Sequence, residues 1–277
     1  MQTTMTWNAA EPDMETVLNN YVDPLLSLAK ADIPAIMLRN AYEPAQCTEL
    51  LQRFTDWGLM RDPNVASADK RNRIDIGSSL NNKGDDKEHF LNHAVATHEL
   101  YKFLFTGFDD PVKCMYDALS QLAAGKKVMV GQEPDGRQYG PAIFRIHYES
   151  HSYKPHIDHV TLREKRFNYA ASRFTHQFAG ILCLQNASQQ GRSAQTILHQ
   201  CLWTEDVQPH IEAETFPEYA ADNNIGNYRV DLAPGDLYFF NTRCIHEIPP
   251  IDGDNPRAVL AVFIGYSEDD DEIFVWS

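Results

Sequence analysis

Three side chains near the middle of the chain, His156, Asp158 and His159, are of the types that bind metal ions. They lie in SYKPHIDHV, residues 152–160. Side chains at positions i and i+2 of a β-strand point to the same face, so His156 and Asp158 can approach one metal ion together. Alternating polar residues also describe the solvent-exposed face of an ordinary strand. The pair therefore needs a third ligand from another part of the chain.

His246 is the candidate for that third ligand. It follows the apolar run LYFF, residues 237–240, which begins after the turn sequence APGD, and two prolines come soon after the histidine. A turn before the strand and prolines after the histidine hold this side chain at a defined place. Two neutral imidazoles and one carboxylate on one side of a metal are the ligands of non-heme Fe(II) oxygenases, whose opposite coordination positions stay open.

The second half of the chain resembles the double-stranded β-helix core of the Fe(II)/2-oxoglutarate-dependent oxygenases, especially the branch with prolyl-hydroxylase-like spacing. The segments HYESHSYKPHID and GDLYFFNTRCIHEIPPI carry the resemblance, together with Arg257, eleven residues beyond His246. It implies that His156, Asp158 and His246 are the metal ligands and carry the catalysis. It also implies that Arg257 holds the distal carboxylate of 2-oxoglutarate, with Tyr148 as a further hydrogen-bond donor to it.

The resemblance implies Fe(II), 2-oxoglutarate and O2 as cofactor and cosubstrates, and hydroxylation of an unactivated C–H bond with release of succinate and CO2. In the related aliphatic halogenases a small residue at the carboxylate position leaves room for chloride, whereas this chain has Asp158. Hydroxylation is therefore favoured, and desaturation or cyclisation are alternatives. Action on a protein side chain is another alternative. A cupin-like metal-binding protein without redox chemistry is an alternative of a different class.

Basic residues gather in HVTLREKRFNYAASRFT, residues 159–175, directly after the candidate ligands, although the chain as a whole is acidic. We expect this segment to be a rim or lid in which Arg163 and Arg166 bind an anionic small molecule, such as an amino acid or an N-acyl amino acid. A solvated segment that pairs with acids elsewhere explains the charges equally well. Arg73, in the first half of the chain, is a further candidate for substrate binding.

The elements that position these residues divide the chain near residue 141. Before it, EPAQCTELLQRFTDW and HFLNHAVATHELYKFLF repeat apolar residues at helical intervals, and Val95 is among the expected core residues. After it come seven short strand segments, AIFRIHYE, FAGILCLQN, AQTILH, NYRVDL, GDLYFFN, RAVLAVFIGY and EIFVW. On the first of them, Tyr148 is expected to face the site and His147 to point away from it.

These patterns predict an α+β fold in a single catalytic domain, residues 1–277. A mainly helical part, residues 1–140, packs on a double-stranded β-helix (jelly-roll, cupin-like) core, residues 141–277.

The composition limits the partners and the location. The 39 acidic and 24 basic side chains leave a formal net charge of −15, which repels phosphate backbones and anionic membranes. We therefore expect neither nucleic acid nor a membrane as a partner. The five cysteines are scattered without a CxxC pair, and the N-terminus does not resemble a signal peptide. These features predict a cytoplasmic protein with reduced thiols, and a homodimer is compatible with them.

Overall fold

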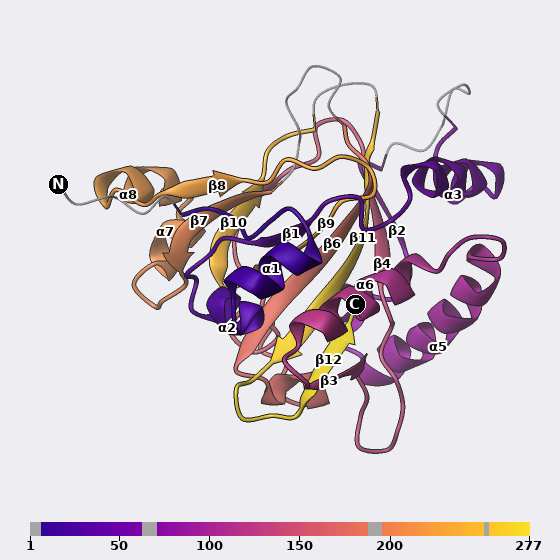
Figure 1. The fold of residues 1–277 in the computed structure, drawn as a ribbon, viewed down its shortest axis with the longest axis horizontal. Helices are drawn as coiled ribbons and strands as arrows, with labels where there is room; N and C mark the ends of the chain where they lie inside the picture. Colours follow the sequence, from indigo (N-terminus) through magenta and orange to yellow (C-terminus); the bar gives the residue numbers. More distant parts are fainter. Residues whose placement is uncertain (1–6, 63–70, 188–195, 252–254) are drawn as a thin grey trace.

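The structure, a computed structural model, describes residues 7–62, 71–187, 196–251 and 255–277. Within these residues the fold is a mixed α/β arrangement of two β-sheets and surrounding helices (Figure 1). All strand pairings in both sheets are antiparallel except that of β3 with β12. The predicted antiparallel character of the sheets is confirmed. No helix in the described part of the chain is long and apolar enough to cross a bilayer.

The larger sheet takes strands from both halves of the chain. Its strands are β1 (Ile36–Leu38), β2 (Arg73–Ile76), β3 (Lys127–Val130), β4 (Ile143–His147), β6 (His176–Gln185), β9 (Leu237–Asn241), β11 (Arg257–Tyr266) and β12 (Glu272–Trp276). They are ordered β1-β9-β6-β11-β12-β3, and β4 pairs with both β11 and β2. Residue 141 is therefore not a boundary of the sheet, because β1, β2 and β3 come from the part predicted to be mainly helical.

The smaller sheet is built from β5 (Tyr153–His156), β7 (Ile197–Leu202), β8 (Asn227–Arg229) and β10 (Cys244–Ile248), in the order β5-β10-β7-β8. Two short helices, α7 (Gln208–Glu212) and α8 (Phe216–Asp222), are inserted between β7 and β8. In Figure 1 this sheet and its helices lie at the end of the molecule away from α3 and α5. Each of the seven predicted strand segments overlaps an observed strand.

Six helices precede the β4 strand in the described residues: α1 (Met14–Asn20), α2 (Pro24–Ala29), α3 (Pro44–Asp56), α4 (Leu80–Lys83), α5 (Lys87–Leu104) and α6 (Pro111–Leu122). A single 3-10 turn, η1 (Ala170–Arg173), follows the HxD segment. Several helices begin at an aspartate whose carboxylate accepts a backbone N–H of the first turn, as at Asp23, Asp86 and Asp110. These caps fix where the helices begin relative to the sheet.

Both helices predicted from apolar spacing are present. In α3, Cys47, Leu50, Leu51 and Phe54 are buried as expected. In α5 the buried residues include Phe90, Ala94 and Tyr101, but Val95 is 61% exposed. Its assignment to the core was wrong, because the buried stripe of this helix passes through Thr97 and Tyr101 and leaves Val95 on the solvent side.

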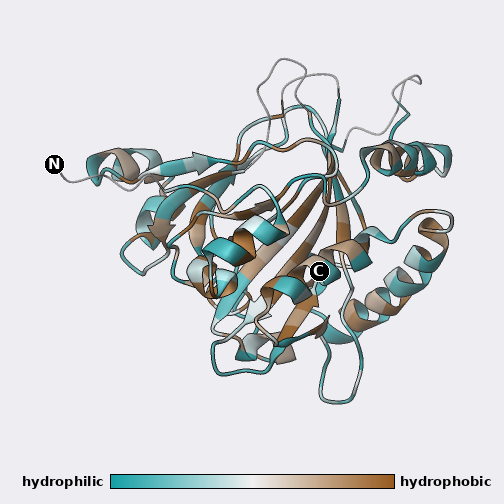
Figure 2. Ribbon diagram, viewed as in Figure 1, coloured by the Kyte–Doolittle hydropathy of each residue, from teal (hydrophilic) through white to brown (hydrophobic). Residues whose placement is uncertain are grey.

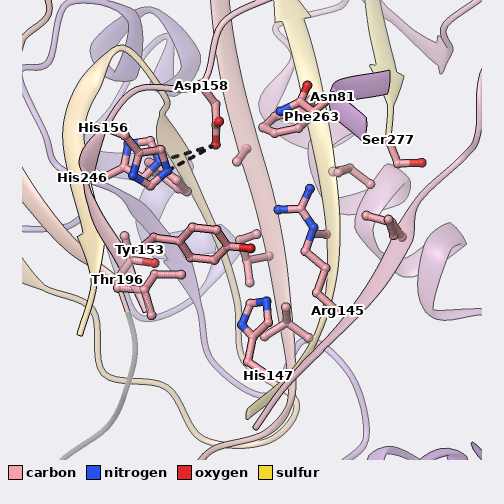
Figure 3. Close-up of a pocket in the computed structure, with 18 of the residues that line it drawn as sticks. Asn81, Arg145, His147, Tyr153, His156, Asp158, Thr196, His246, Phe263 and Ser277 are labelled. Carbon is pink, nitrogen blue, oxygen red and sulfur yellow. Dashed lines mark ion pairs between the residues drawn. The ribbon is translucent and has the colours of Figure 1, made fainter. Parts of the chain in front are cut away.

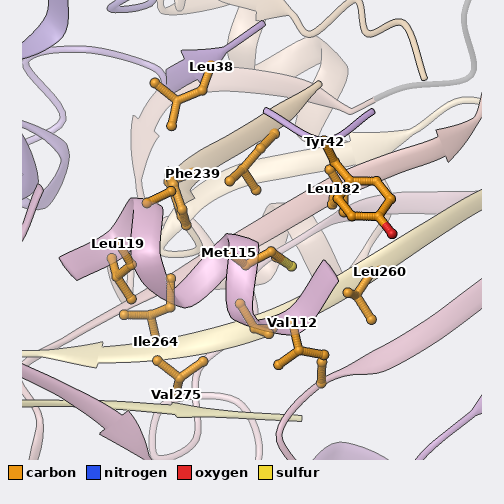
Figure 4. Close-up of a cluster of buried hydrophobic side chains, with 14 of the residues drawn as sticks. Leu38, Tyr42, Val112, Met115, Leu119, Leu182, Phe239, Leu260, Ile264 and Val275 are labelled. Atoms are coloured by element: carbon orange, nitrogen blue, oxygen red, sulfur yellow. The ribbon is translucent and has the colours of Figure 1, made fainter. Parts of the chain in front are cut away.

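The two faces of the larger sheet have different roles. One face packs against the helices, and Figure 4 shows the α6 side chains Met115 and Leu119 close to Phe239 and Ile264 of the sheet. Colouring by hydropathy shows the same division, with hydrophobic central strands and polar outer helix faces (Figure 2). Because side chains alternate along a strand, the other face carries a second set of residues. That second face forms one wall of the cavity described next.

Candidate active site

The structure brings His156, Asp158 and His246 together (Figure 3). His156 on β5 and His246 on β10 are directly opposite each other in the antiparallel register, and their ring centroids are 4.3 Å apart. Oδ2 of Asp158 lies 3.8 Å from Nε2 of His156 and 3.6 Å from Nε2 of His246. The three candidate ligand atoms are all within 4.8 Å of one another, which is close enough for one metal ion to contact all of them.

Backbone carbonyls orient both imidazoles. Nδ1 of His156 donates to the carbonyl of Lys154 over 2.7 Å, and Nδ1 of His246 donates to the carbonyl of Cys244 over 2.9 Å. Since a carbonyl only accepts hydrogen bonds, Nδ1 carries the proton and the lone pair is on Nε2, which faces Asp158. Burial lowers the pKa of His156 to about 4, so this ring is neutral at neutral pH. Both rings are therefore prepared as metal ligands.

Asp158 does not lie on the strand that carries His156. Strand β5 ends at His156, and the backbone N–H of Asp158 donates to the carbonyl of Thr242, which precedes β10. The expectation of an i, i+2 pair on one strand was wrong in this detail. The strand stops because the ladder between β5 and β10 ends at the pair of histidines, and the carboxylate reaches the imidazoles from the loop.

Arg163 holds the carboxylate of Asp158. Its Nη1 donates to Oδ1 of Asp158 and to the carbonyl of Ile157, both over 2.8 Å. Oδ1 is thereby occupied, and Oδ2 is the oxygen that faces the histidines. Burial acts to raise the pKa of Asp158, but the interactions with His246, His156 and Arg163 outweigh it and lower the pKa. The carboxylate is therefore ionised and points one oxygen at the metal position.

Replacing Arg163 with glutamine is expected to weaken iron binding, because Asp158 then loses the partner that orients it. Loss of such a supporting contact typically lowers metal affinity by about 10- to 100-fold. Anaerobic titration with Fe(II) measures the effect. Arg166→Gln is the matched control, since Arg166 belongs to the same segment and makes no contact with Asp158. Equal iron affinities for the Arg163→Gln variant and the wild type would contradict this role.

The basic segment after the HxD pair is only partly a rim. Arg163 and Glu164 line the cavity, whereas Arg166 does not. Arg166 is buried and binds Glu164, Asp85 and the carbonyl of Asn81, which ties the segment to helix α4. Arg166 thus has a structural role, and Arg163 binds Asp158. Of the two explanations for these charges, pairing with nearby acids agrees better with the geometry.

A buried arginine and a buried histidine form the floor of the cavity. Arg257 begins β11 opposite His147 of β4, and its Nη1 donates to Nδ1 of His147 over 3.1 Å. Burial and the charge of Arg257 lower the pKa of His147 well below its usual range. The neutral ring therefore carries its proton on Nε2, an atom that is buried and has no hydrogen-bond partner among the described residues. An unpaired buried donor marks a place for an acceptor.

Tyr148 lies outside this cavity, contrary to the predicted placement. Its hydroxyl accepts the backbone N–H of Arg61 over 3.0 Å, and its ring packs under the Arg61 guanidinium. His147, predicted to point away from the site, lines the cavity. The alternation of the two side chains was recognised, but their faces were reversed, because alternation distinguishes two faces of a strand without saying which one faces the metal.

Arg73 lines the cavity but is already engaged by its own strand. It makes a two-point contact with Asp75, with distances of 2.7 and 2.6 Å, and donates to the hydroxyl of Tyr153 over 2.6 Å. Tyr153 is a cavity residue that the sequence analysis did not select. Its position three residues before His156 in SYKPH was the available signal.

The cavity between the two sheets has a volume of about 280 Å³. Polar side chains line much of the cavity, and apolar side chains, among them Ile143, Ile181, Phe240, Val259 and Phe263, line the rest. Apolar side chains combined with a few placed polar groups are typical of small-molecule sites. Arg145 also lines this cavity and, like His147, was not selected from the sequence. The alternation of Arg145 and His147 in the apolar strand AIFRIHYE was the signal for both.

The donor set fits iron, because two imidazole Nε2 atoms and one carboxylate oxygen converge on one place. With a buried arginine in the same cavity, the fold and site define an Fe(II)/2-oxoglutarate-dependent oxygenase, a class that also uses O2. The chain belongs to the family described as carrier-protein-independent halogenase WelO5, which it matches over residues 11–277. The suspected superfamily is thereby confirmed.

Two solved structures with TM-scores above 0.5 agree with this fold. An N-substituted L-amino acid dioxygenase from Burkholderia ambifaria AMMD, solved in complex with α-ketoglutarate, matches with a TM-score of 0.57 at 14% identity, covering 91% of this chain and 90% of that chain. A second structure described by the same name and organism has a TM-score of 0.58 at 16% identity, with the same coverage. The α-ketoglutarate-dependent epimerase SnoN of nogalamycin biosynthesis gives 0.43 at 11% identity, covering 84% and 80%. The curated proteins include no match.

Proposed function

We propose that the protein is an Fe(II)- and 2-oxoglutarate-dependent dioxygenase that hydroxylates an unactivated C–H bond of a small anionic molecule. One oxygen atom of O2 enters the product, the other enters succinate, and CO2 is released. His156, Asp158 and His246 hold the iron, which together with its cosubstrates supplies the oxidising chemistry. The surrounding residues orient the cosubstrate, position the target carbon and exclude water.

The carboxylate of Asp158 is the observation that supports hydroxylation rather than halogenation. The related aliphatic halogenases have a small residue here and leave room for chloride, whereas Oδ2 of Asp158 lies within 3.8 Å of both histidine Nε2 atoms. Arg163 also holds this carboxylate in place. We infer that the iron has its third protein ligand from Asp158, so the protein differs in this respect from the activity in its family's name.

Arg257 and His147 are the groups that we assign to the distal carboxylate of 2-oxoglutarate. Arg257 is permanently charged, and a guanidinium can grip a carboxylate through two parallel hydrogen bonds. The Nε2–H of His147 adds a neutral donor in the same buried floor. His147 thus replaces Tyr148 as the expected second hydrogen-bond donor to this carboxylate, because Tyr148 lies outside the cavity.

A small carboxylic acid is the substrate class that we propose, with an amino acid or N-acyl amino acid as the first choice. The cavity volume of about 280 Å³ and its apolar wall favour a small molecule over a protein side chain. One solved neighbour is described as an N-substituted L-amino acid dioxygenase. Desaturation or cyclisation is a second outcome of the same ligand set, and the family match disfavours the cupin-like protein without redox chemistry.

We also make proposals about the fold, the location and the partners of the protein. We propose that the two sheets form the double-stranded β-helix of this class, because the cavity lies between them with the ligands at its edge. We keep three further predictions: a cytoplasmic location, a homodimer, and the exclusion of nucleic acid and membrane as partners. The negative net charge of −15 is the observation behind the last of these.

An anaerobic titration tests the proposed function. Fe(II) added with excess 2-oxoglutarate is expected to produce the visible charge-transfer band of the chelated cosubstrate. Admission of O2 with N-acetyl-L-leucine or related acids should then release succinate and add one oxygen atom to the acid, as measured by mass spectrometry. With chloride present, no chlorinated product is expected. Absence of the band, or chlorination in place of hydroxylation, would refute the proposal.

A further inference from the structure

Arg145 stands in the middle of strand β4 and lines the cavity from the larger sheet (Figure 3). Its neighbours across the two strand ladders are Asp75 on β2 and Val259 on β11. The two histidines of the triad belong to the smaller sheet, so Arg145 approaches the cavity from the opposite wall. Arg145 is neither one of the proposed metal ligands nor one of the residues assigned to 2-oxoglutarate.

The other cavity arginines are engaged, and Arg145 is not. Arg73 grips both oxygens of Asp75, although Asp75 is the direct cross-strand partner of Arg145. Arg163 binds Asp158, and Arg257 binds His147. Within the described residues no hydrogen bond or ion pair reaches Arg145, whose Nε is buried without a partner. Its one aromatic contact is the ring of Phe263, 5.9 Å from the guanidinium carbon.

The neighbouring carboxylate of Asp75 is already bound by Arg73, so the guanidinium of Arg145 lies in the cavity without a bound acid, which is costly unless a ligand supplies the negative charge. We propose that Arg145 is the recognition site for the carboxylate of the substrate, an inference that rests on the proposed function. The guanidinium suits this ligand because its fork binds both oxygens of a carboxylate. The 2-oxoglutarate molecule has its own arginine in Arg257, so the charge of Arg145 is left for a second acid.

The surroundings of Arg145 indicate what is attached to that carboxylate. Ile143 precedes it on the same face of β4, and Val259, Ala261 and Phe263 lie along the facing side of β11. These side chains offer an apolar surface directly beside the cation. The fitting ligand is therefore a small acid whose carboxylate is adjacent to an apolar body, as in an N-acyl derivative of leucine or phenylalanine.

Matched ligand pairs test the site without requiring turnover. N-acetyl-L-leucine and N-acetyl-L-leucinamide, and the corresponding phenylalanine pair, are titrated anaerobically into the protein loaded with Fe(II) and 2-oxoglutarate. Binding is followed by the shift of the charge-transfer band and by calorimetry. The wild type should prefer the acid over the amide by roughly tenfold or more, and Arg145→Gln should remove this preference. Arg145→Lys should retain part of it, because the charge is kept and the fork is lost.

Three results would overturn the inference while the proposed function stands, since the band itself tests the latter. One is an unchanged preference in Arg145→Gln. Another is the absence of any preference, or of any binding, for all pairs in the wild type. The third is a loss of 2-oxoglutarate affinity in Arg145→Gln as large as that in Arg257→Gln, which would assign Arg145 to the cosubstrate. Arg173→Gln serves as the control, because Arg173 pairs with Asp270 and Glu272 outside the cavity.

Discussion

Replacing His246 with alanine is expected to abolish the iron site and turnover together. The imidazole supplies one of three converging ligand atoms, and within the described residues no further His, Cys, Asp or Glu is grouped with them. Loss of a contact that only supports a ligand costs about 10- to 100-fold in metal affinity, so loss of the ligand itself should exceed roughly 100-fold. The charge-transfer band with 2-oxoglutarate and succinate release should both disappear.

The matched control for this prediction is His210→Ala. His210 lies on α7 with its ring near Thr215 and Tyr219, and it does not line the cavity. Comparison of the thermal unfolding midpoints separates a lost ligand from a misfolded chain, since His246 is itself buried. A His246→Ala variant that is folded and still binds Fe(II) as tightly as the wild type would show that the metal is held elsewhere.

Replacing Arg257 with glutamine is expected to raise the 2-oxoglutarate concentration needed for half-saturation by roughly 10- to 150-fold. This range corresponds to the loss of a hydrogen bond to a charged group, about 1.5–3 kcal/mol. Iron affinity measured without cosubstrate should change little, because Arg257 lies on the sheet opposite the two histidines of the triad and binds His147. The measurement is an anaerobic titration of 2-oxoglutarate, followed by its charge-transfer band.

Two companion variants sharpen this second prediction. His147→Phe keeps an aromatic ring but removes Nε2–H, so it should weaken 2-oxoglutarate binding less than Arg257→Gln does, since only a neutral donor is lost. Tyr148→Phe should leave the affinity unchanged, because its hydroxyl accepts the N–H of Arg61 outside the cavity. An Arg257→Gln variant with wild-type affinity for 2-oxoglutarate would remove this arginine from the cosubstrate seat.

The family name and the site chemistry point to different reactions, and Asp158 is the residue that separates them. Membership of the WelO5 family follows from a match over residues 11–277, which reflects a shared fold and core motif. A shared fold is compatible with several reactions, and the reaction depends on the individual residues at the site. The carboxylate of Asp158, held by Arg163, is such a residue.

The face of β4 that lines the cavity could not be predicted from the sequence. The alternation in AIFRIHYE correctly predicted a strand with two different faces, but it gave the cavity face to Tyr148 instead of Arg145 and His147. Both faces of β4 are mostly buried, so alternation along the strand does not say which face meets the metal. Only the pairing of β4 with β11, which also places Arg257 opposite His147, decides which face meets the metal.

The binding partners of the arginines are a second feature that the sequence did not reveal. Arg163 and Arg166 were selected because positive charges stood out in an acidic chain, and each of them binds an acid of the protein. Arg145 has no local excess of charge around it in the sequence, yet among the described residues no hydrogen bond or ion pair reaches it, and its Nε is buried. Charge counting along the chain does not reveal this, because ion pairs form between residues brought together by folding.

Residue spacing and local propensities, which act within a few residues, were enough to predict the types of the ligands, the strand segments after residue 141 and the mixture of helices and antiparallel strands. Only the tertiary structure decided that His156 faces His246, that Arg163 orients Asp158, and which side of β4 enters the cavity. These outcomes depend on strand register and sheet packing between segments roughly 90 residues apart for the two histidines. Contacts over such separations are set by how the whole core packs, and no local pattern encodes them.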